Sequence, residues 1–158
     1  MKTITIVVLA SMILTFSQMT LAQTARTFRI QATVPSGKKS KEVSANMTFG
    51  PDSVTIGSQK AGVLNKEFNY SDVRSVDYSY SKKPLLSTGG AVAMAILTGL
   101  IVIPFLFVKK KQHWLTVRTE NDYVVMRLDK GNFRQIQSEF EIKKIKVTTL
   151  DEDKKDGK

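Results

Sequence analysis

Side chains that could perform acid–base or metal chemistry are few in this chain of 158 residues. It has one histidine, His113, and no cysteine. Disulfide scaffolds, cysteine-ligated metal sites and thiol catalysis are therefore excluded, and a multi-histidine site has little to work with. Two carboxylate pairs are close in sequence, Asp72 with Asp77 and Glu139 with Glu141. Neither pair has a setting that would separate its two pKa values, as acid–base catalysis requires. We interpret them as surface charges and predict no catalytic residue, metal or cofactor.

Basic residues dominate the charge, with a formal net charge of +10. Such a balance suits nucleic acid or anionic lipid. Lysines bracket a long apolar run here, so we expect membrane lipid, anionic in character, and no nucleic acid as partner. A plainer interpretation is that these lysines are the solvated ends of a membrane segment. Trp114 either lies at the membrane–water boundary or opens a strand and packs inside the fold. The predicted membrane-interface residues are Lys82, Lys83, Lys109, Lys110, Lys111 and Trp114.

The first 22 residues have the three parts of a secretory signal peptide. Lys2 gives a basic start, an apolar stretch follows, and Thr20 and Ala22 form a small-residue exit. We expect cleavage before Gln23, export to the cell envelope, and an extracytoplasmic soluble part. The alternative is an uncleaved anchor helix, although several hydroxyl-bearing residues dilute its apolar run.

An uncharged run covers residues 84–108. As one helix, its last 24 residues would reach ~36 Å, enough to cross a hydrocarbon layer of ~30 Å. Glycines and Pro104 could instead bend it into a hairpin that enters and leaves by one face. A buried helix of a soluble domain is the third possibility. Small residues at four-residue spacing would let another helix pack closely on the segment: Ala91, Ala95 and Gly99.

The rest of the chain reads as short strands with turns and one helix. Phe28, Ile30, Ala32 and Val34 fall on one face of the first strand. We place a loop at 38–42, a turn at 71–72, and a helix after 132 with Asn132 as its N-cap. The predicted strands are 27–34, 46–49, 53–57, 66–70, 73–80, 114–118 and 123–128, and the helical stripe is Phe133, Ile136 and Phe140.

This order predicts a mainly β fold with one C-terminal α-helix, of the α+β class. One β domain is formed in two parts, 23–83 and 109–150, and the apolar segment 84–108 interrupts it. Residues 151–158 carry seven charges and a glycine, which predicts a disordered tail.

The stretch from Met47 to Tyr80 consists of a hairpin, a gap, and then the line from Phe68 through Ser71-Asp72 to Val76. Together with the closing segment from Leu128 into the helix, it resembles the bacterial pleckstrin-homology-like and GRAM-like domains. The resemblance covers roughly residues 44–147. It implies a small barrel of about seven strands whose open end is closed by the helix. This chain differs in its apolar insertion and secretory start.

These features together predict a membrane-tethered, non-enzymatic binding module for a lipid headgroup or a protein partner. The alternative is a structural subunit that docks against a larger membrane complex through Ala91, Ala95 and Gly99.

Overall fold

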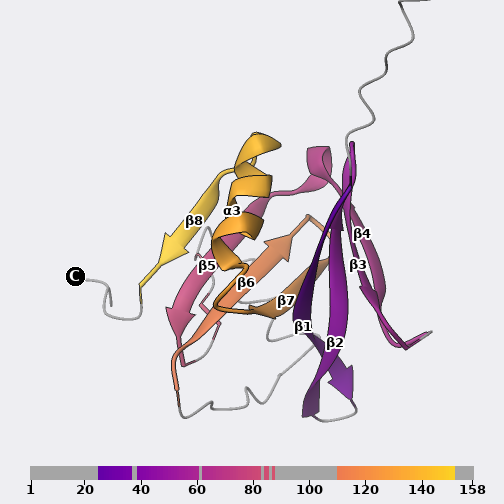
Figure 1. Ribbon diagram of the computed structural model, residues 1–158, viewed down its shortest axis with the longest axis vertical. Coiled ribbons are helices and arrows are strands. Elements are labelled where there is room, and N and C mark those ends of the chain that lie inside the picture. Colours follow the sequence, from indigo (N-terminus) through magenta and orange to yellow (C-terminus); the bar gives the residue numbers. More distant parts are fainter. Residues whose placement is uncertain are drawn as a thin grey trace, which may run out of the picture.

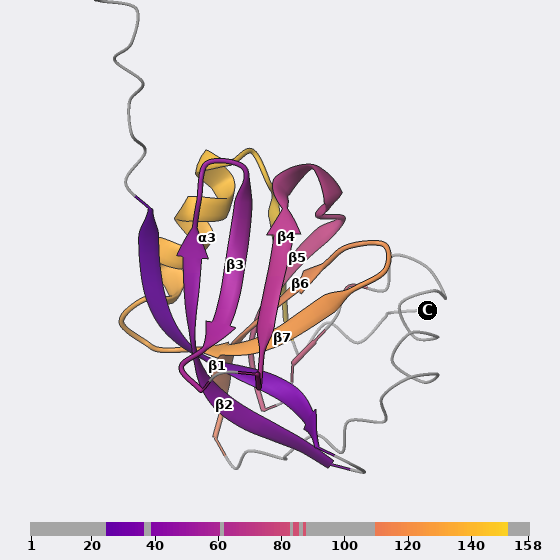
Figure 2. The ribbon, with the colours of Figure 1, turned by 90° about the vertical axis from the view of Figure 1, so that its right-hand side faces the viewer.

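The computed structural model describes residues 25–36, 39–60, 62–82, 84–85, 87 and 110–151, which form eight strands and one α-helix (Figures 1 and 2). In chain order the elements are β1 (Arg26–Ser36), β2 (Lys39–Phe49), β3 (Ser53–Ser58), β4 (Asn65–Asn69), the short 3-10 helix η2 (Tyr70–Asp72), β5 (Ser75–Ser81), β6 (Gln112–Arg118), β7 (Tyr123–Leu128), α3 (Phe133–Ile142) and β8 (Val147–Leu150).

All eight strands belong to one open sheet in the order β4-β3-β2-β1-β7-β6-β5-β8. Neighbours pair antiparallel, except that β8 runs parallel to β5. The pairing of β1 with β7, from Ile30↔Leu128 to Thr33↔Val125, joins strands that lie before and after the apolar run in the sequence. Both parts of the chain therefore build the same sheet, which curls around one core (Figure 2).

The core follows from the alternation of apolar side chains along the strands. In β1, Ile30, Ala32 and Val34 are buried on one face, as the period-two pattern predicts. The helix contributes Ile136 and Phe140, both fully buried in the same cluster. A mainly β fold with one C-terminal helix is thus confirmed.

Three local predictions were wrong. The predicted loop at 38–42 is the start of β2, because β1 and β2 pair over their whole length as far as Ser36↔Lys39. The predicted turn at 71–72 falls in the single turn of η2, but the strand predicted from residue 73 begins only at Ser75. An eighth strand, β8, exists because Val147–Leu150 can pair with the free edge of β5.

Asn132 precedes α3 but makes no side-chain cap of the helix, contrary to the predicted N-cap. Its Nδ2 instead donates a hydrogen bond of 2.7 Å to the backbone carbonyl of Arg29 in β1. A contact across the fold therefore fixes the start of the helix, in place of the local hydrogen bond that an N-cap asparagine usually accepts.

Several predicted features lie outside the described residues: the signal peptide, the tail beyond residue 151, Lys83 and Lys109, and the small-residue set Ala91, Ala95 and Gly99. Of the apolar segment, only residues 84, 85 and 87 are described. Within the described ranges, no helix combines the length and apolar character needed to cross a membrane.

Candidate functional site

The segments that flank the apolar run lie side by side at one end of the sheet. β5 stops at Ser81 and β6 starts at Gln112, and these two residues are directly paired. Opposite residues of an antiparallel pair have Cα atoms about 5 Å apart. Three predicted interface lysines, Lys82, Lys110 and Lys111, lie just beyond this pair and are exposed. The fold thus gathers basic residues separated by about 30 positions in the sequence.

Trp114, another predicted interface residue, is only 4% exposed. Its Nε1 donates a hydrogen bond of 3.1 Å to the backbone carbonyl of Ser81. The indole therefore packs inside the fold, which is the second of the two interpretations given for Trp114. Its hydrogen bond connects β6 to the last residue of β5.

Four rings form a cluster next to this junction: Tyr78, Tyr80, His113 and Phe133. The His113 ring stacks on Phe133 with centroids 4.0 Å apart and lies 4.7 Å from the Tyr80 ring. Tyr78 stacks on Phe133 at 5.8 Å, and its hydroxyl shares a hydrogen bond of 2.7 Å with Nδ1 of His113. Tyr78 is buried, whereas Tyr80 is 53% exposed. The cluster therefore runs from the core to the surface.

Cations border these rings on the helix side. The Arg134 guanidinium lies 5.6 Å from the Phe133 centroid, within the range of a cation–π contact. Burial, and secondarily the positive charge of Lys130, lowers the pKa of His113 below its ordinary value. Burial also raises the pKa of Tyr78. His113 is therefore a neutral ring near pH 7.

The described start of the apolar segment runs back along the other face of β5. The backbone N–H of Leu85 donates to Oγ of Ser79, and that of Ser87 donates to Oδ2 of Asp77, both at 3.3 Å. Asp77 is 1% exposed, so its interpretation as a surface charge was wrong. Among the described residues, its Oδ1 and the hydroxyl of the paired Thr116, both buried, have no hydrogen-bond partner.

Glu139 is likewise buried, contrary to the surface interpretation, because α3 turns it toward the start of β1. Its Oε1 forms an ion pair of 2.6 Å with Arg26. The other member of each sequence pair, Asp72 and Glu141, is exposed. In each pair one carboxylate is buried and the other is exposed. The buried members, Asp77 and Glu139, form bonds within the fold and do not line the pocket described below.

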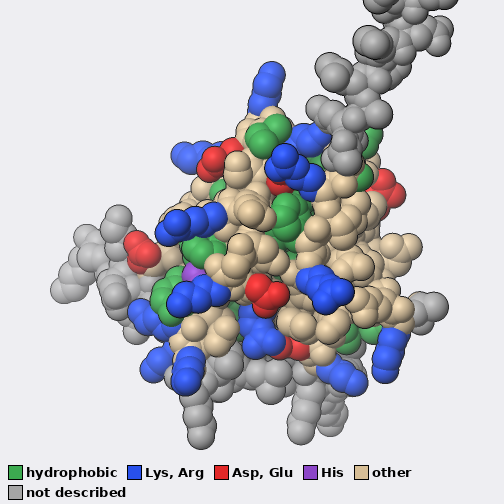
Figure 3. Space-filling model, in the orientation of Figure 1, with side chains coloured by type: hydrophobic (Ala, Val, Ile, Leu, Met, Phe, Trp, Pro, Cys, Tyr) green, Lys and Arg blue, Asp and Glu red, His purple; other side chains and the backbone are tan. Residues whose placement is uncertain are grey.

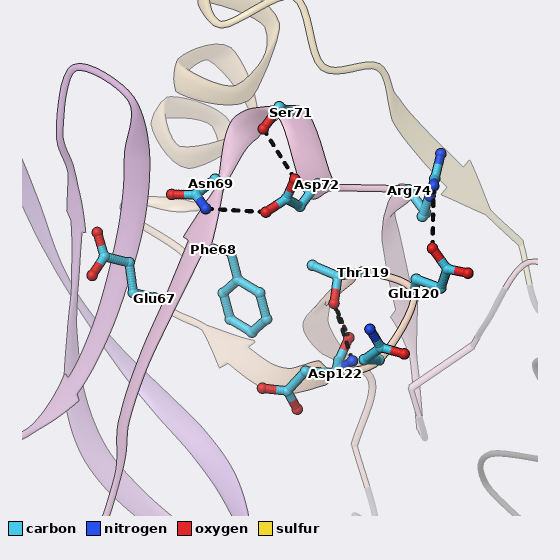
Figure 4. Close-up of a pocket in the computed structure, with 10 residues that line it drawn as sticks. Glu67, Phe68, Asn69, Ser71, Asp72, Arg74, Thr119, Glu120 and Asp122 are labelled. Carbon is cyan, nitrogen blue, oxygen red and sulfur yellow. Dashed lines mark hydrogen bonds and ion pairs between the residues drawn. The ribbon is translucent and has the colours of Figure 1, made fainter.

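A separate pocket of about 320 Å³ lies between β4, η2 and the β6–β7 turn (Figure 4). Its lining is rich in carboxylates, with the Phe68 ring between the two sides; the lining residues are Glu67, Phe68, Asn69, Ser71, Asp72, Arg74, Thr119, Glu120, Asn121 and Asp122. No local pattern in the sequence indicates this pocket, because its two sides are about 50 residues apart and only the fold brings them together.

Every carboxylate of the pocket already has a partner. Asn69 and Ser71 donate hydrogen bonds to Asp72, and these bonds, more than the nearby Arg74, lower the pKa of that carboxyl. The remaining three pairs are Ser53 with Glu67, Arg74 with Glu120, and Lys66 with Asp122. Among the described residues, no group of three or more His, Asp or Glu side chains could hold a metal ion. The pocket thus offers neither an unpaired base nor a described ligand set.

No protein-family model matches the chain, and no curated protein matches it. Among solved structures, the chain is similar to one titled "The hSac2 domain from human phosphoinositide phosphatase Sac2". The two are 9% identical, with a TM-score of 0.48, and the match covers 96% of this chain and 93% of the other. A likeness this distant assigns neither a family nor an activity to the chain.

Proposed function

We propose that this chain is a membrane-tethered, non-enzymatic binding module of the cell envelope, held to the bilayer by residues 84–108. The observation that supports the proposal is the pairing of Ser81 with Gln112, which brings the segments that flank the apolar run together at one end of one sheet. A run whose flanking segments lie together can enter and leave a bilayer by one face. A single crossing would require its two ends to lie about 30 Å apart.

We also propose that the sheet is a pleckstrin-homology-like barrel. Its support is the succession of antiparallel hairpins, the joining of β1 to β7, and a C-terminal helix whose Ile136 and Phe140 pack into the core. The open edges belong to β4 and β8.

The test compares the full chain with a variant in which a short glycine–serine linker replaces residues 89–108. The variant keeps residues 84–88, because Leu85 and Ser87 bond to β5. We expect the full chain to float with lipid vesicles and to remain in the membrane pellet after a carbonate wash. The variant should be soluble with an unchanged β-sheet circular dichroism spectrum. Full-length protein that washes off would contradict the proposal.

A matched control replaces Ala91, Ala95 and Gly99 by leucine, which keeps the run apolar but removes its small-residue stripe. We expect this variant to stay in the membrane. Native mass measurement of the detergent-extracted protein should give a lone chain for both forms. A defined hetero-complex that this variant loses would favour the structural-subunit alternative.

A further inference from the structure

An exposed aromatic surface with a basic border lies at the end of the sheet where the apolar run begins. We define the aromatic–basic surface by Tyr80, His113, Phe133, Lys130 and Arg134. In Figure 3 the single purple side chain, which is His113, lies among green side chains with blue ones on several sides. Tyr80 and His113 are directly paired across β5 and β6, and Phe133 stacks on His113 from the first residue of α3.

The aromatic side chains reach the surface because the helix covers only part of this face. Val76 and Tyr78 of β5 are buried, yet Tyr80, the next residue on the same face, is 53% exposed. It extends beyond the start of α3 at Phe133. Amphipathic aromatic rings of this kind are enriched at the headgroup level of bilayers.

The charge of this region favours an anionic partner. Neither Lys130 nor Arg134 forms an ion pair among the described residues. Three more lysines, Lys82, Lys110 and Lys111, lie exposed beyond the paired strand ends. The described carboxylates nearest to these five cations along the chain are those of Asp129, Asp77 and Glu139, and Glu139 is paired with Arg26, so the cations outnumber the acids.

The position of the surface relative to the apolar run identifies the partner. Tyr80 precedes Lys82 by two residues, and His113 follows Lys111 by two. Two residues of extended chain span roughly 7 Å. Lys82 and Lys111 therefore lie beside the aromatic rings, and a bilayer that takes up the run at this end of the sheet brings the rings close to its headgroup layer.

We infer that the aromatic–basic surface rests on an anionic lipid leaflet and fixes the orientation of the sheet on the membrane. This inference rests on the proposed tethering and adds the face that contacts lipid, the lipid charge it requires, and the residues responsible. The opposite end of the sheet, which carries the β2–β3 turn and η2 (Figure 1), then points away from the bilayer.

The experiment measures the depth of single fluorescent labels on the full-length chain in vesicles. The chain has no cysteine, so one introduced cysteine takes one label. Gly131→Cys lies beside the surface, and a Cβ there meets no atom within 4 Å. Asp52→Cys lies in the β2–β3 turn at the other end and serves as the distant position. Lipids with a nitroxide on the headgroup act as the quencher.

In vesicles with anionic lipid we expect severalfold stronger quenching at position 131 than at position 52. In neutral vesicles this difference should shrink. Adding Lys130→Gln and Arg134→Gln to the Gly131→Cys chain should lower the ratio of docked to undocked molecules roughly 30-fold, because each base near an anionic surface changes it about fivefold. The matched control, Lys144→Gln with Lys146→Gln, removes the same charge after the other end of α3 and should leave quenching unchanged.

Vesicle flotation separates the two levels of failure. A chain that floats while both labels are quenched equally, or while position 131 is unquenched, overturns this inference and leaves the tether in place. Equal effects of the two charge-removing variants would overturn the role assigned to Lys130 and Arg134. A chain that does not float overturns the tethering and, with it, the inference.

Discussion

The ring of Phe140 is fully buried and meets the edge of Phe49 with centroids 5.0 Å apart. It links the helix to β2, so its removal leaves a cavity that the surrounding strands cannot fill. We expect Phe140→Ala to lower the free energy of unfolding by about 3–5 kcal/mol, measured by urea denaturation. The control Ile142→Ala, on the same helix but with a side chain 61% exposed, should change it by less than about 0.5 kcal/mol. Equal losses would show that α3 packs differently.

His113 makes stability depend on pH. Its pKa lies below the ordinary value of 6.5 in the folded state, where it faces Tyr78, Tyr80, Phe133 and the charge of Lys130. Between the folded pKa and 6.5 the unfolded chain binds more protons, so the free energy of unfolding falls as the pH is lowered through this window. Above pH 6.5 the contribution is constant.

The measurement is the difference in unfolding free energy between the native chain and His113→Gln at several pH values. We expect this difference to shrink as the pH falls below 6.5, since glutamine does not titrate. A difference that stays constant, or that grows toward acid, would contradict burial of the neutral ring.

At the scale of elements, the start of α3 depends on a bond to β1. Asn132 donates to the Arg29 carbonyl, and its buried Oδ1 has no partner in the part of the chain that the structure describes. Aspartate cannot make this donation, and its charge would face a carbonyl oxygen. We therefore expect Asn132→Asp to destabilise the fold at least as much as Asn132→Ala, by about 1 kcal/mol or more. An N-cap residue would behave differently, because aspartate replaces asparagine there with little loss. Thermal melts of the two variants distinguish these cases.

The sequence predicts those elements whose pattern is local. Ile30, Ala32 and Val34 reveal the buried face of β1, and the spacing of Ile136 and Phe140 reveals the helix. The start of β2 at Lys39 is polar and β8 is only four residues long, so both depend on pairing with distant strands and give little local signal. The same reason applies to the candidate site. Lys82 and Lys111 could be singled out because they flank the apolar run in the sequence, whereas the stacking of Phe133 on His113 joins residues 20 positions apart across two elements.

At the scale of the whole molecule, the shared sheet predicts a common side of the membrane for both parts of the chain. Lys60 lies in the exposed β3–β4 turn and Asn121 in the exposed β6–β7 turn, one before and one after the apolar run. We expect Lys60→Cys and Asn121→Cys, made singly, to react with an impermeant thiol reagent from the same side of sealed vesicles. Labelling from opposite sides would mean that β1 and β7 are not paired in the membrane-bound protein.

The pairing of Ser81 with Gln112 also has a consequence for the folding rate. The residues from 82 to 111, 30 in number, separate two strands that a two-residue turn could join. Closing a flexible loop of that length, compared with a two-residue one, costs roughly 2.4 kcal/mol of chain entropy. In water, β5 therefore meets β6 slowly, while the hairpins of β1 to β4 can form early from local contacts. Under the proposed tethering, a bilayer that holds the two ends of the run together would remove much of this search and accelerate completion of the sheet.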